Sequence, residues 1–111
     1  MTGGAGLIGA HLIKSLLKKE EKVICLDNFS TSSKINIVEF LEERNFELLE
    51  MDVMNKVDIK VDKIWHLANP ASPKYYGQNP IKTSNICYLG TNNMLKLAKK
   101  NNAKFLFSST S

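Results

Sequence analysis

Three equally spaced glycines lie near the start of the chain and directly precede a pattern typical of an amphipathic helix. Gly3, Gly6 and Gly9 form a G-x-x-G-x-x-G motif. In a phosphate-binding turn the first glycine permits a tight turn, the second lets the backbone approach a pyrophosphate, and the third allows close packing of the helix. Free N–H groups and the dipole at the start of that helix favour an anion. The motif predicts such a turn, with a flexible glycine-rich tail as the alternative.

The residues after the glycines support the first interpretation. An apolar stripe at helical spacing predicts a helix near residues 7–19; its members are Ile8, Leu12, Ile13, Leu16 and Leu17. A short apolar run of strand type follows and ends in Asp27, eighteen residues after Gly9. A carboxylate at this place can accept hydrogen bonds from the adenosine ribose and repels a 2′-phosphate. Asp27 therefore predicts a dinucleotide site that favours NAD over NADP, with a solvated loop carboxylate as the alternative.

Helical and strand patterns alternate along the rest of the chain. Further helices are expected near residues 34–44 and 81–101, and strands near residues 23–27, 46–51, 63–67 and 104–108. Ser32 or Ser33 is expected to cap the first of these helices. Its inward side chains are expected to be Ile35, Val38 and Leu41. Three prolines predict that residues 70–80 are not helical.

This alternation predicts an α/β fold, a Rossmann-like doubly wound parallel sheet. Only Met1 and Thr2 precede Gly3, so the first, central strand is expected to be missing. We expect a gap or a foreign filler in the sheet at that place. Residues 1–111 are accordingly interpreted as a fragment, a partial N-terminal NAD-binding domain that lacks its first strand and a C-terminal substrate domain.

Composition narrows the possible partners. Hydrophobic residues make up 43% and charged residues 23% of the chain, as in soluble globular proteins. The net charge is +4, but the lysines are scattered and form no basic stripe with interleaved aromatics. The sequence thus argues against nucleic acid. No bilayer-spanning run or signal peptide is recognisable, so no membrane partner and a cytoplasmic location are expected. Neither the cysteines nor His11 and His66 have metal-ligand spacing, and no metal site is predicted.

Several motifs together resemble the extended short-chain dehydrogenases that act on nucleotide sugars, the NAD-dependent epimerase/dehydratase group. These motifs lie at residues 2–9, 27–29, 52–53, 66–68, 90–91 and 107–110. Within the group, the Pro-Ala-Ser-Pro segment at 70–73, the Tyr-Tyr pair at 75–76 and residues 79–83 are most similar to the UDP-glucuronate decarboxylase family. The resemblance covers essentially the whole chain.

The resemblance implies a role for individual residues. The NAD-binding residues would be Gly3, Gly6, Leu7, Ile8, Gly9, Asp27, Asn28, Phe29, Ser30, Thr31, Asp52, Val53, Leu67, Ala68 and Asn69. Among them, residues 6–8 would face the pyrophosphate, 52–53 the adenine and 67–69 the nicotinamide ribose. Ser72, Pro73 and Tyr76 would approach the sugar, and Thr110 would be the catalytic hydroxyl.

The implied reaction begins with oxidation of UDP-glucuronate at C4 by NAD⁺. The resulting β-keto acid loses CO₂, and the returned hydride gives UDP-xylose. A homodimer is expected for the full-length protein. The chain departs from the family in having Cys87 and Asn85 where asparagine and lysine are usual, and in lacking the Tyr-x-x-x-Lys pair that supplies the general base. The fragment by itself is therefore expected to be inactive.

Three alternatives stay open: a 4,6-dehydratase, a 4-epimerase and a non-catalytic NAD-binding module. Dehydratases of this group have an Asp–Glu pair directly after the active-site threonine, whereas Ser111 follows Thr110 here. Epimerases of the group lack the Pro-Ala-Ser-Pro segment. A non-catalytic NAD-binding module is the alternative from a different functional class.

Overall fold

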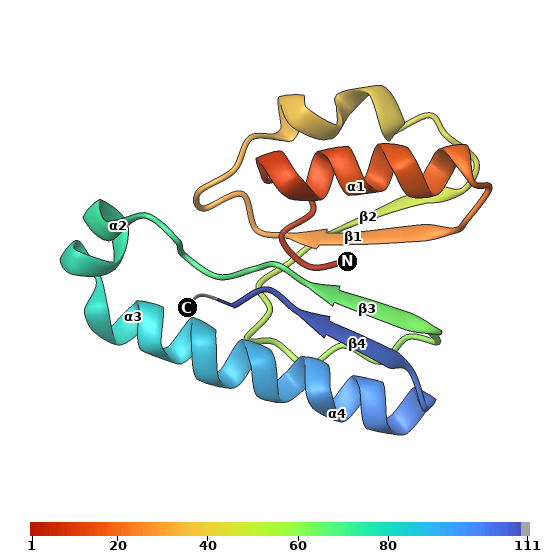
Figure 1. Cartoon of the computed structure of the whole chain (residues 1–111). Coiled ribbons are helices and arrows are strands. Elements are labelled where there is room, and N and C mark those ends of the chain that lie inside the picture. Colours follow the sequence, from red (N-terminus) through yellow and green to blue (C-terminus); the bar gives the residue numbers. More distant parts are fainter. Residues whose placement is uncertain (110–111) are drawn as a thin grey trace.

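Two pairs of parallel strands form the centre of the structure (Figure 1). The computed structural model describes residues 1–109. Strand β1 (Val23–Asp27) pairs with β2 (Phe46–Glu50), and β3 (Lys63–His66) pairs with β4 (Lys104–Phe107). Thr2 joins the two pairs through parallel bridges to Leu26 and His66. The order across the sheet is therefore β2, β1, Thr2, β3 and β4, which confirms the α/β class with parallel strands.

Helices cover both faces of these strands, as Figure 1 shows. Helix α1 (Leu7–Lys18) and the 3₁₀ helix η1 (Lys34–Phe40) lie on one face. The other face carries a continuous helical stretch that consists of α3 (Pro80–Asn85), the π-helical turn η2 (Ile86–Gly90) and α4 (Thr91–Asn101). The short helix α2 (Pro73–Gln78) lies beyond the carboxyl ends of β1 and β3.

Separate hydrophobic clusters form beneath the two helical layers. The cluster under α1 and η1 consists of Ala5, Ile13, Val23, Cys25, Ile37, Phe40 and Phe46. The cluster under α4 consists of Ile64, Met94, Leu97 and Ala98. Burial of these apolar side chains is the main favourable contribution to folding. Ile8, a member of the apolar stripe of α1, is instead exposed, as are Leu89 of η2 and Leu95 of α4.

The prediction of a helix over residues 34–44 is wrong in type, length and inward face. Element η1 is a 3₁₀ helix that ends at Phe40, and Ser33 caps it by accepting from Ile35 N–H at 3.4 Å. Its buried side chains are Ile37 and Phe40, three residues apart. Side chains three apart eclipse one another in a 3₁₀ helix. Ile37 and Phe40 therefore form one row that faces the core, and the residues predicted to face inward, at 35, 38 and 41, form another row that is exposed.

The prediction that residues 70–80 are not helical is also wrong. Pro73 and Pro80 each stand at the start of a short helix, α2 and α3. Proline is tolerated there because the first amides of a helix have no intrahelical acceptor and the fixed φ suits the helix. Pro73 and Pro80 thus begin helices instead of preventing them, and the helix expected near residues 81–101 starts at Pro80.

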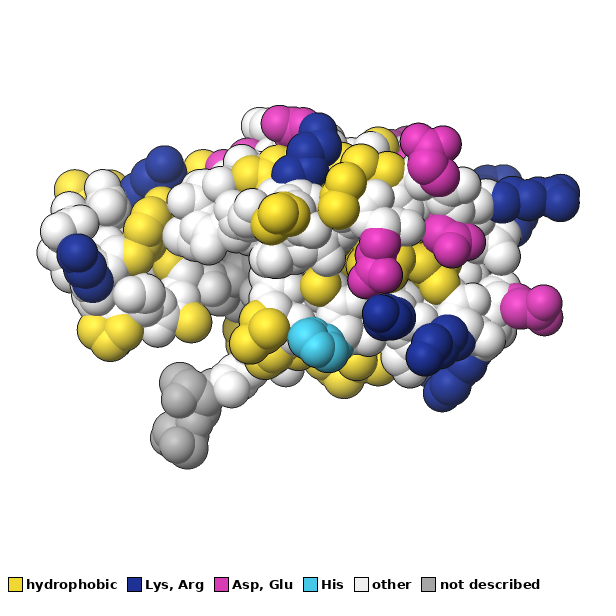
Figure 2. Space-filling view, turned by 90° about the horizontal axis from the view of Figure 1, so that it is seen from above, with side chains coloured by type: hydrophobic (Ala, Val, Ile, Leu, Met, Phe, Trp, Pro, Cys, Tyr) yellow, Lys and Arg dark blue, Asp and Glu magenta, His cyan; other side chains and the backbone are white. Residues whose placement is uncertain are grey.

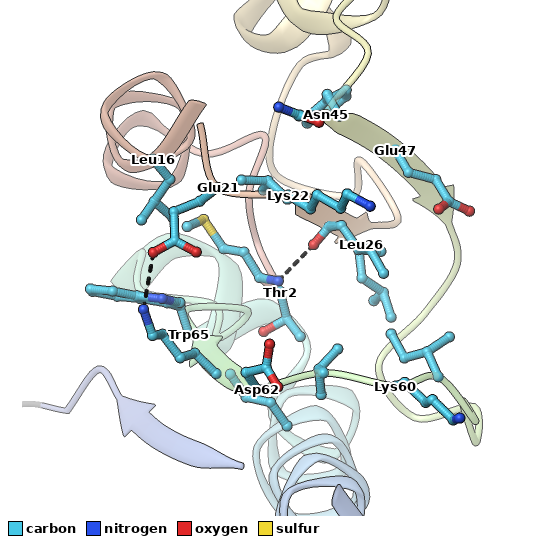
Figure 3. Close-up of a pocket in the computed structure, with 18 of the residues that line it drawn as sticks. Thr2, Leu16, Glu21, Lys22, Leu26, Asn45, Glu47, Lys60, Asp62 and Trp65 are labelled. Carbon is cyan, nitrogen blue, oxygen red and sulfur yellow. Dashed lines mark hydrogen bonds and ion pairs between the residues drawn. The ribbon is translucent and has the colours of Figure 1, made fainter. Parts of the chain in front are cut away.

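A cavity of about 630 Å³ separates β1 from β3 on the amino side of Thr2 (Figure 3). Its walls include Ile24, Trp65 and the core residue Leu97. Met1 reaches into this space and its ammonium donates to the Ile24 carbonyl at 2.7 Å. Burial lowers the pKa of this ammonium. The predicted gap in the sheet is confirmed, because Met1 and Thr2 fill only its carboxyl end.

Charges of both signs are interspersed on the face seen in Figure 2, with hydrophobic side chains between them. Four Lys–carboxylate pairs among the described residues are solvent-exposed, and pairs of this kind contribute little to stability. None of the helices described between residues 1 and 109 is both long and apolar enough to traverse a membrane.

Candidate functional site

The glycine turn connects Thr2 to helix α1 and packs against the end of β3. Gly3 has a φ of +67°, and a Cβ at this position would lie 2.8 Å from the Ala68 nitrogen. A Cβ on Gly9 would lie 2.5 Å from the Gly3 carbonyl oxygen. Both distances are too short for real Cβ contacts, so the turn requires glycine for its conformation at the first position and for close approach at the last.

The N-terminus of α1 opens at this turn without a side-chain cap. Gly6 is the N-cap residue, and no acidic residue occupies the first turn. Leu7 and Ile8 are 76% and 68% exposed. These two residues can therefore serve a ligand through their backbone N–H groups, while their side chains point to solvent. The amides and the helix dipole together form a cradle for an anion.

Asp27, at the end of β1, is buried and holds the glycine turn in place. One of its carboxylate oxygens accepts from Ala5 N–H at 2.9 Å. The other accepts from Phe29 N–H at 2.9 Å and from the Ser32 hydroxyl at 2.8 Å. A carboxylate can accept about four hydrogen bonds, so capacity remains for a ligand hydroxyl. Asp27 thus supports the turn and still faces the cavity described below.

A second carboxylate stands at the end of the neighbouring strand. Asp52 accepts from the Asn28 side-chain amide at 2.9 Å and from Met54 N–H at 2.9 Å. The Asn93 side chain, from α4, donates to the carbonyls of Val53 and Met54 at 3.0 and 2.8 Å. These bonds fix the loops after β1 and β2 beside each other.

Most of the predicted cofactor residues meet around one cavity of about 150 Å³ at the carboxyl ends of the strands. The predicted residues that line it are Gly3, Gly6, Asp27, Asn28, Ser30, Thr31, Asp52, Val53, Leu67, Ala68 and Asn69. Leu7, Ile8, Gly9 and Phe29 do not line it. Crevices at this edge, where strand order reverses, are the usual ligand sites of open α/β sheets.

One polar atom among the lining residues has no partner in the structure. The side-chain oxygen of Asn69 is buried and makes no hydrogen bond. Such an atom costs free energy unless a ligand or water satisfies it. Together with the glycine cradle that a Cβ would obstruct, this acceptor fits a dinucleotide, whose phosphates and ribose hydroxyls match the amides, Asp27 and Asn69.

The predicted substrate and catalytic residues are not part of this cavity. Ser72 precedes α2, while Pro73 and Tyr76 lie on it, and all three are exposed. Thr110, the predicted catalytic hydroxyl, lies outside the described residues. Asn85 and Cys87, which replace the residues usual in the family, are both exposed.

Sequence reasoning missed several supporting residues. Asn36, on η1, donates to the Ala5 carbonyl at 2.8 Å and so anchors the turn from outside. Ser32 was considered only as a helix cap, yet its hydroxyl binds Asp27. The sequence signal that could have pointed to Ser32 is the polar character of residues 28–33, but this character does not indicate which side chains face the turn. No cluster of three or more potential metal ligands occurs among residues 1–109.

Comparison with known proteins agrees with this geometry. The model of the GDP-mannose 4,6-dehydratase family matches residues 1–111. UDP-glucuronic acid decarboxylase 1 of Arabidopsis thaliana is 47% identical over 111 residues, which are 100% of this chain and 26% of the relative. The chain therefore spans about a quarter of the length of this curated relative.

Solved structures show the same arrangement. Pal from Bacillus thuringiensis has a TM-score of 0.91 at 30% identity, covering 98% of this chain and 37% of that one. UDP-glucose 4-epimerase of Thermus thermophilus, solved in complex with NAD, has a TM-score of 0.80 at 25% identity, covering 98% and 36%.

Proposed function

The chain belongs to the GDP-mannose 4,6-dehydratase family of NAD-dependent epimerases and dehydratases, and on that basis we propose that it is the NAD-binding part of a UDP-glucuronate decarboxylase. The observation that carries the cofactor assignment is the convergence of the glycine turn, Asp27 and the 67–69 segment on one cavity. The identity of 47% to a UDP-glucuronic acid decarboxylase supports the choice of substrate.

In this proposal the residues of the cavity and the adjoining N-terminus of α1 bind different parts of the dinucleotide. The amides at the start of α1 bind the pyrophosphate, since they are uncapped and no acidic side chain competes in the first turn. Asp27 accepts from the adenosine ribose. Asp52 and Val53 would lie beside the adenine, and the unpartnered oxygen of Asn69 would accept from the nicotinamide ribose.

When bound, NAD supplies a reversible hydride acceptor for C4 of the sugar, so the decarboxylation consumes no external oxidant. The chain's own contribution is to hold the reacting groups in place. Ser72 and Tyr76 are positioned beyond the carboxyl edge, where they contact the sugar in this proposal. From the family resemblance, Thr110 would hydrogen-bond the hydroxyl that is oxidised. The proton of that hydroxyl needs a base that these 111 residues do not provide, because their sequence lacks the Tyr-x-x-x-Lys pair.

Calorimetric titration of the 111-residue chain with NAD and NADP tests the cofactor assignment. A 2′-phosphate beside the Asp27 carboxylate places two like charges in a partly desolvated site, which costs at least about 1–2 kcal/mol. We therefore expect NAD to bind about tenfold more tightly than NADP. Asp27→Asn should reduce this preference. Equal affinities for the two cofactors in the wild-type chain would refute the role given to Asp27.

A chimera tests catalysis. Residues 1–111 replace the matching residues of the Arabidopsis decarboxylase, and the unaltered relative is the control. The isolated chain should turn over no UDP-sugar, whereas the chimera should convert UDP-glucuronate to UDP-xylose and CO₂ with no net consumption of NAD. In the chimera, Thr110→Val should lower kcat much more than it weakens NAD binding. A chimera that binds NAD but releases no CO₂ contradicts the proposal.

Product analysis on the natural gene product separates the other candidates. Formation of a 4-keto-6-deoxy sugar would indicate a dehydratase, and formation of UDP-galacturonate would indicate a 4-epimerase. Tight NAD binding without a product from any nucleotide sugar would favour a non-catalytic NAD-binding module.

A further inference from the structure

His66 is a fully buried ionisable side chain that the proposed NAD site does not use. It is the last residue of β3 and has no exposed surface. The rings of Phe105 and Phe107 lie against it with centroids 6.0 and 5.7 Å away. Its two nitrogens nevertheless both have hydrogen-bond partners. An imidazole enclosed by aromatic rings and satisfied on both sides is held in one orientation.

Each nitrogen contacts a threonine hydroxyl from a different part of the fold. Nδ1 lies 2.7 Å from the Thr2 hydroxyl, directly before the glycine turn. Nε2 lies 3.1 Å from the Thr91 hydroxyl, at the start of α4. The Thr2 hydroxyl also accepts from Ala68 N–H at 3.3 Å. A chain of polar contacts therefore runs from Ala68, through Thr2 and His66, to Thr91.

The contacts determine where the protons lie. Among residues 1–109, the Thr2 hydroxyl has no acceptor for its own proton other than Nδ1 of His66. Thr2 is buried, so a hydroxyl proton without an acceptor would be costly. Nδ1 must then be the acceptor, and Nε2 must carry the proton and donate to Thr91. Burial and the nearby Met1 ammonium lower the pKa of His66 to about 4, which keeps the ring neutral as this arrangement requires.

The chain of contacts ends at the wall of the candidate NAD site. Ala68 lines the cavity, and its backbone lies 2.8 Å from where a Cβ on Gly3 would stand. Thr2 also binds β3 through its backbone, with N–H to the Trp65 carbonyl at 2.9 Å and carbonyl to Leu67 N–H at 3.1 Å. A small rotation of Thr2 would therefore displace both the glycine turn and the 67–69 segment.

We propose that His66 is a positioning residue which, as the Nε2–H tautomer, holds Thr2 and Ala68 in the geometry that the dinucleotide site needs and anchors them to α4 through Thr91. This inference deepens the proposed function and rests on it. It also assigns a task to the Gly90–Thr91 motif, which NAD binding alone leaves unexplained. Gly90, the residue before α4, lets this helix lie close to the loop after β2, since a Cβ at position 90 would lie 2.6 Å from Cγ2 of Val53.

Matched variants at Thr2 separate positioning from mere stabilisation. Thr2→Val keeps the shape but leaves Ala68 N–H and Nδ1 of His66 unpaired, whereas Thr2→Ser keeps the hydroxyl. NAD affinity of the 111-residue chain is measured at a temperature at which every variant is folded. We expect Thr2→Val to weaken NAD binding about tenfold, because Ala68 N–H loses the hydrogen bond that holds it at the wall of the site, and Thr2→Ser to stay within about twofold.

Variants of His66 itself test which nitrogen matters. His66→Asn places a side-chain oxygen near the position of Nδ1 and can still accept from Thr2, so NAD affinity should fall less than about threefold. His66→Leu removes both contacts and should match Thr2→Val. If the midpoint of unfolding falls in Thr2→Val and His66→Leu while NAD affinity is unchanged, the role is structural only and the proposal is overturned.

Nitrogen-15 NMR of the histidine side chains tests the tautomer in the wild-type chain without any variant or ligand. We expect a protonated Nε2 and an unprotonated Nδ1 at His66, and the opposite tautomer would overturn the proposal. Failure of the wild-type chain to bind NAD would refute the proposed function instead. The tautomer, and amide exchange at Ala68 that accelerates in Thr2→Val but not in Thr2→Ser, would then still decide whether His66 holds this segment.

Discussion

Replacement of Asp27 by asparagine should destabilise the chain even without cofactor. The Asp27 carboxylate accepts three hydrogen bonds, from Ala5 N–H, Phe29 N–H and the Ser32 hydroxyl. Asparagine keeps one carbonyl oxygen, which can serve Phe29 and Ser32, but turns an NH₂ group towards Ala5 N–H. Ala5 N–H then has no acceptor, and among the described residues no other side chain accepts a hydrogen bond from the N–H groups of the glycine turn.

The size of the loss follows from these bonds. A buried N–H left without an acceptor costs about 1–3 kcal/mol, and the two remaining bonds weaken by roughly 0.5 kcal/mol each when the acceptor loses its charge. The expected loss in the free energy of unfolding for Asp27→Asn is therefore about 2–4 kcal/mol. Domains of this size have a total stability of roughly 5–15 kcal/mol. The gap between β1 and β3 should place this chain at the lower end of that range, so the change should shift the unfolding midpoint strongly.

Urea unfolding followed by circular dichroism is the appropriate assay. Asp52→Asn is the matched control, because Asp52 accepts two hydrogen bonds and is only partly buried. The free energy of unfolding of the Asp52→Asn variant should fall by no more than about 1 kcal/mol. If Asp27→Asn loses less than about 0.5 kcal/mol, or no more than Asp52→Asn, the carboxylate does not hold the turn and the reasoning is refuted.

The folded pKa of His66 is about 4 against an ordinary value of 6.5, so the unfolded state binds more protons between these values. The free energy of unfolding should therefore fall by up to about 3 kcal/mol as the pH drops from about 6.5 to about 4. Urea titrations of the wild-type chain and of His66→Gln at each pH isolate this contribution, and a difference in unfolding free energy between the two that does not change with pH would contradict it. Gly90→Ala should cost about 1–3 kcal/mol in thermal unfolding through overpacking against Val53, and the added substitution Val53→Ala should recover part of it, whereas strictly additive losses would exclude that contact. Burial raises the pKa of Cys25 to about 11, so a maleimide should label the exposed Cys87 in the native chain and reach Cys25 only in denaturant, as mass spectrometry of the digest can verify. Because the gap between β1 and β3 leaves backbone groups of both strands without ladder partners, the isolated chain should unfold at low denaturant or aggregate, and a sharp, reversible thermal transition would count strongly against this.

The amino-acid sequence alone was sufficient to predict the α/β class, the strand positions to within a residue or two, and the glycine turn. These features depend on local properties. Gly3 needs a positive φ, an apolar run followed by Asp27 marks the end of a buried strand, and alternating helical and strand periods imply parallel strands. The gap in the sheet could be predicted because only Met1 and Thr2 precede the turn.

Only the tertiary structure decided which side chains face the site and how they are held. The bond from Ala5 to Asp27 joins residues 22 apart, and that from Ala68 to Thr2 joins residues 66 apart. No periodicity in the sequence encodes such pairs. The inward face of η1 likewise depended on packing: Ile37 and Phe40 face the core, whereas the predicted row Ile35, Val38 and Leu41 has the same three-residue spacing and is exposed. His66 had no recognisable partner in the sequence because both of its partners, Thr2 and Thr91, are brought to it by folding. Local propensities thus determine which elements form, whereas the burial of apolar surface brings distant elements together and leaves their polar groups to find partners there.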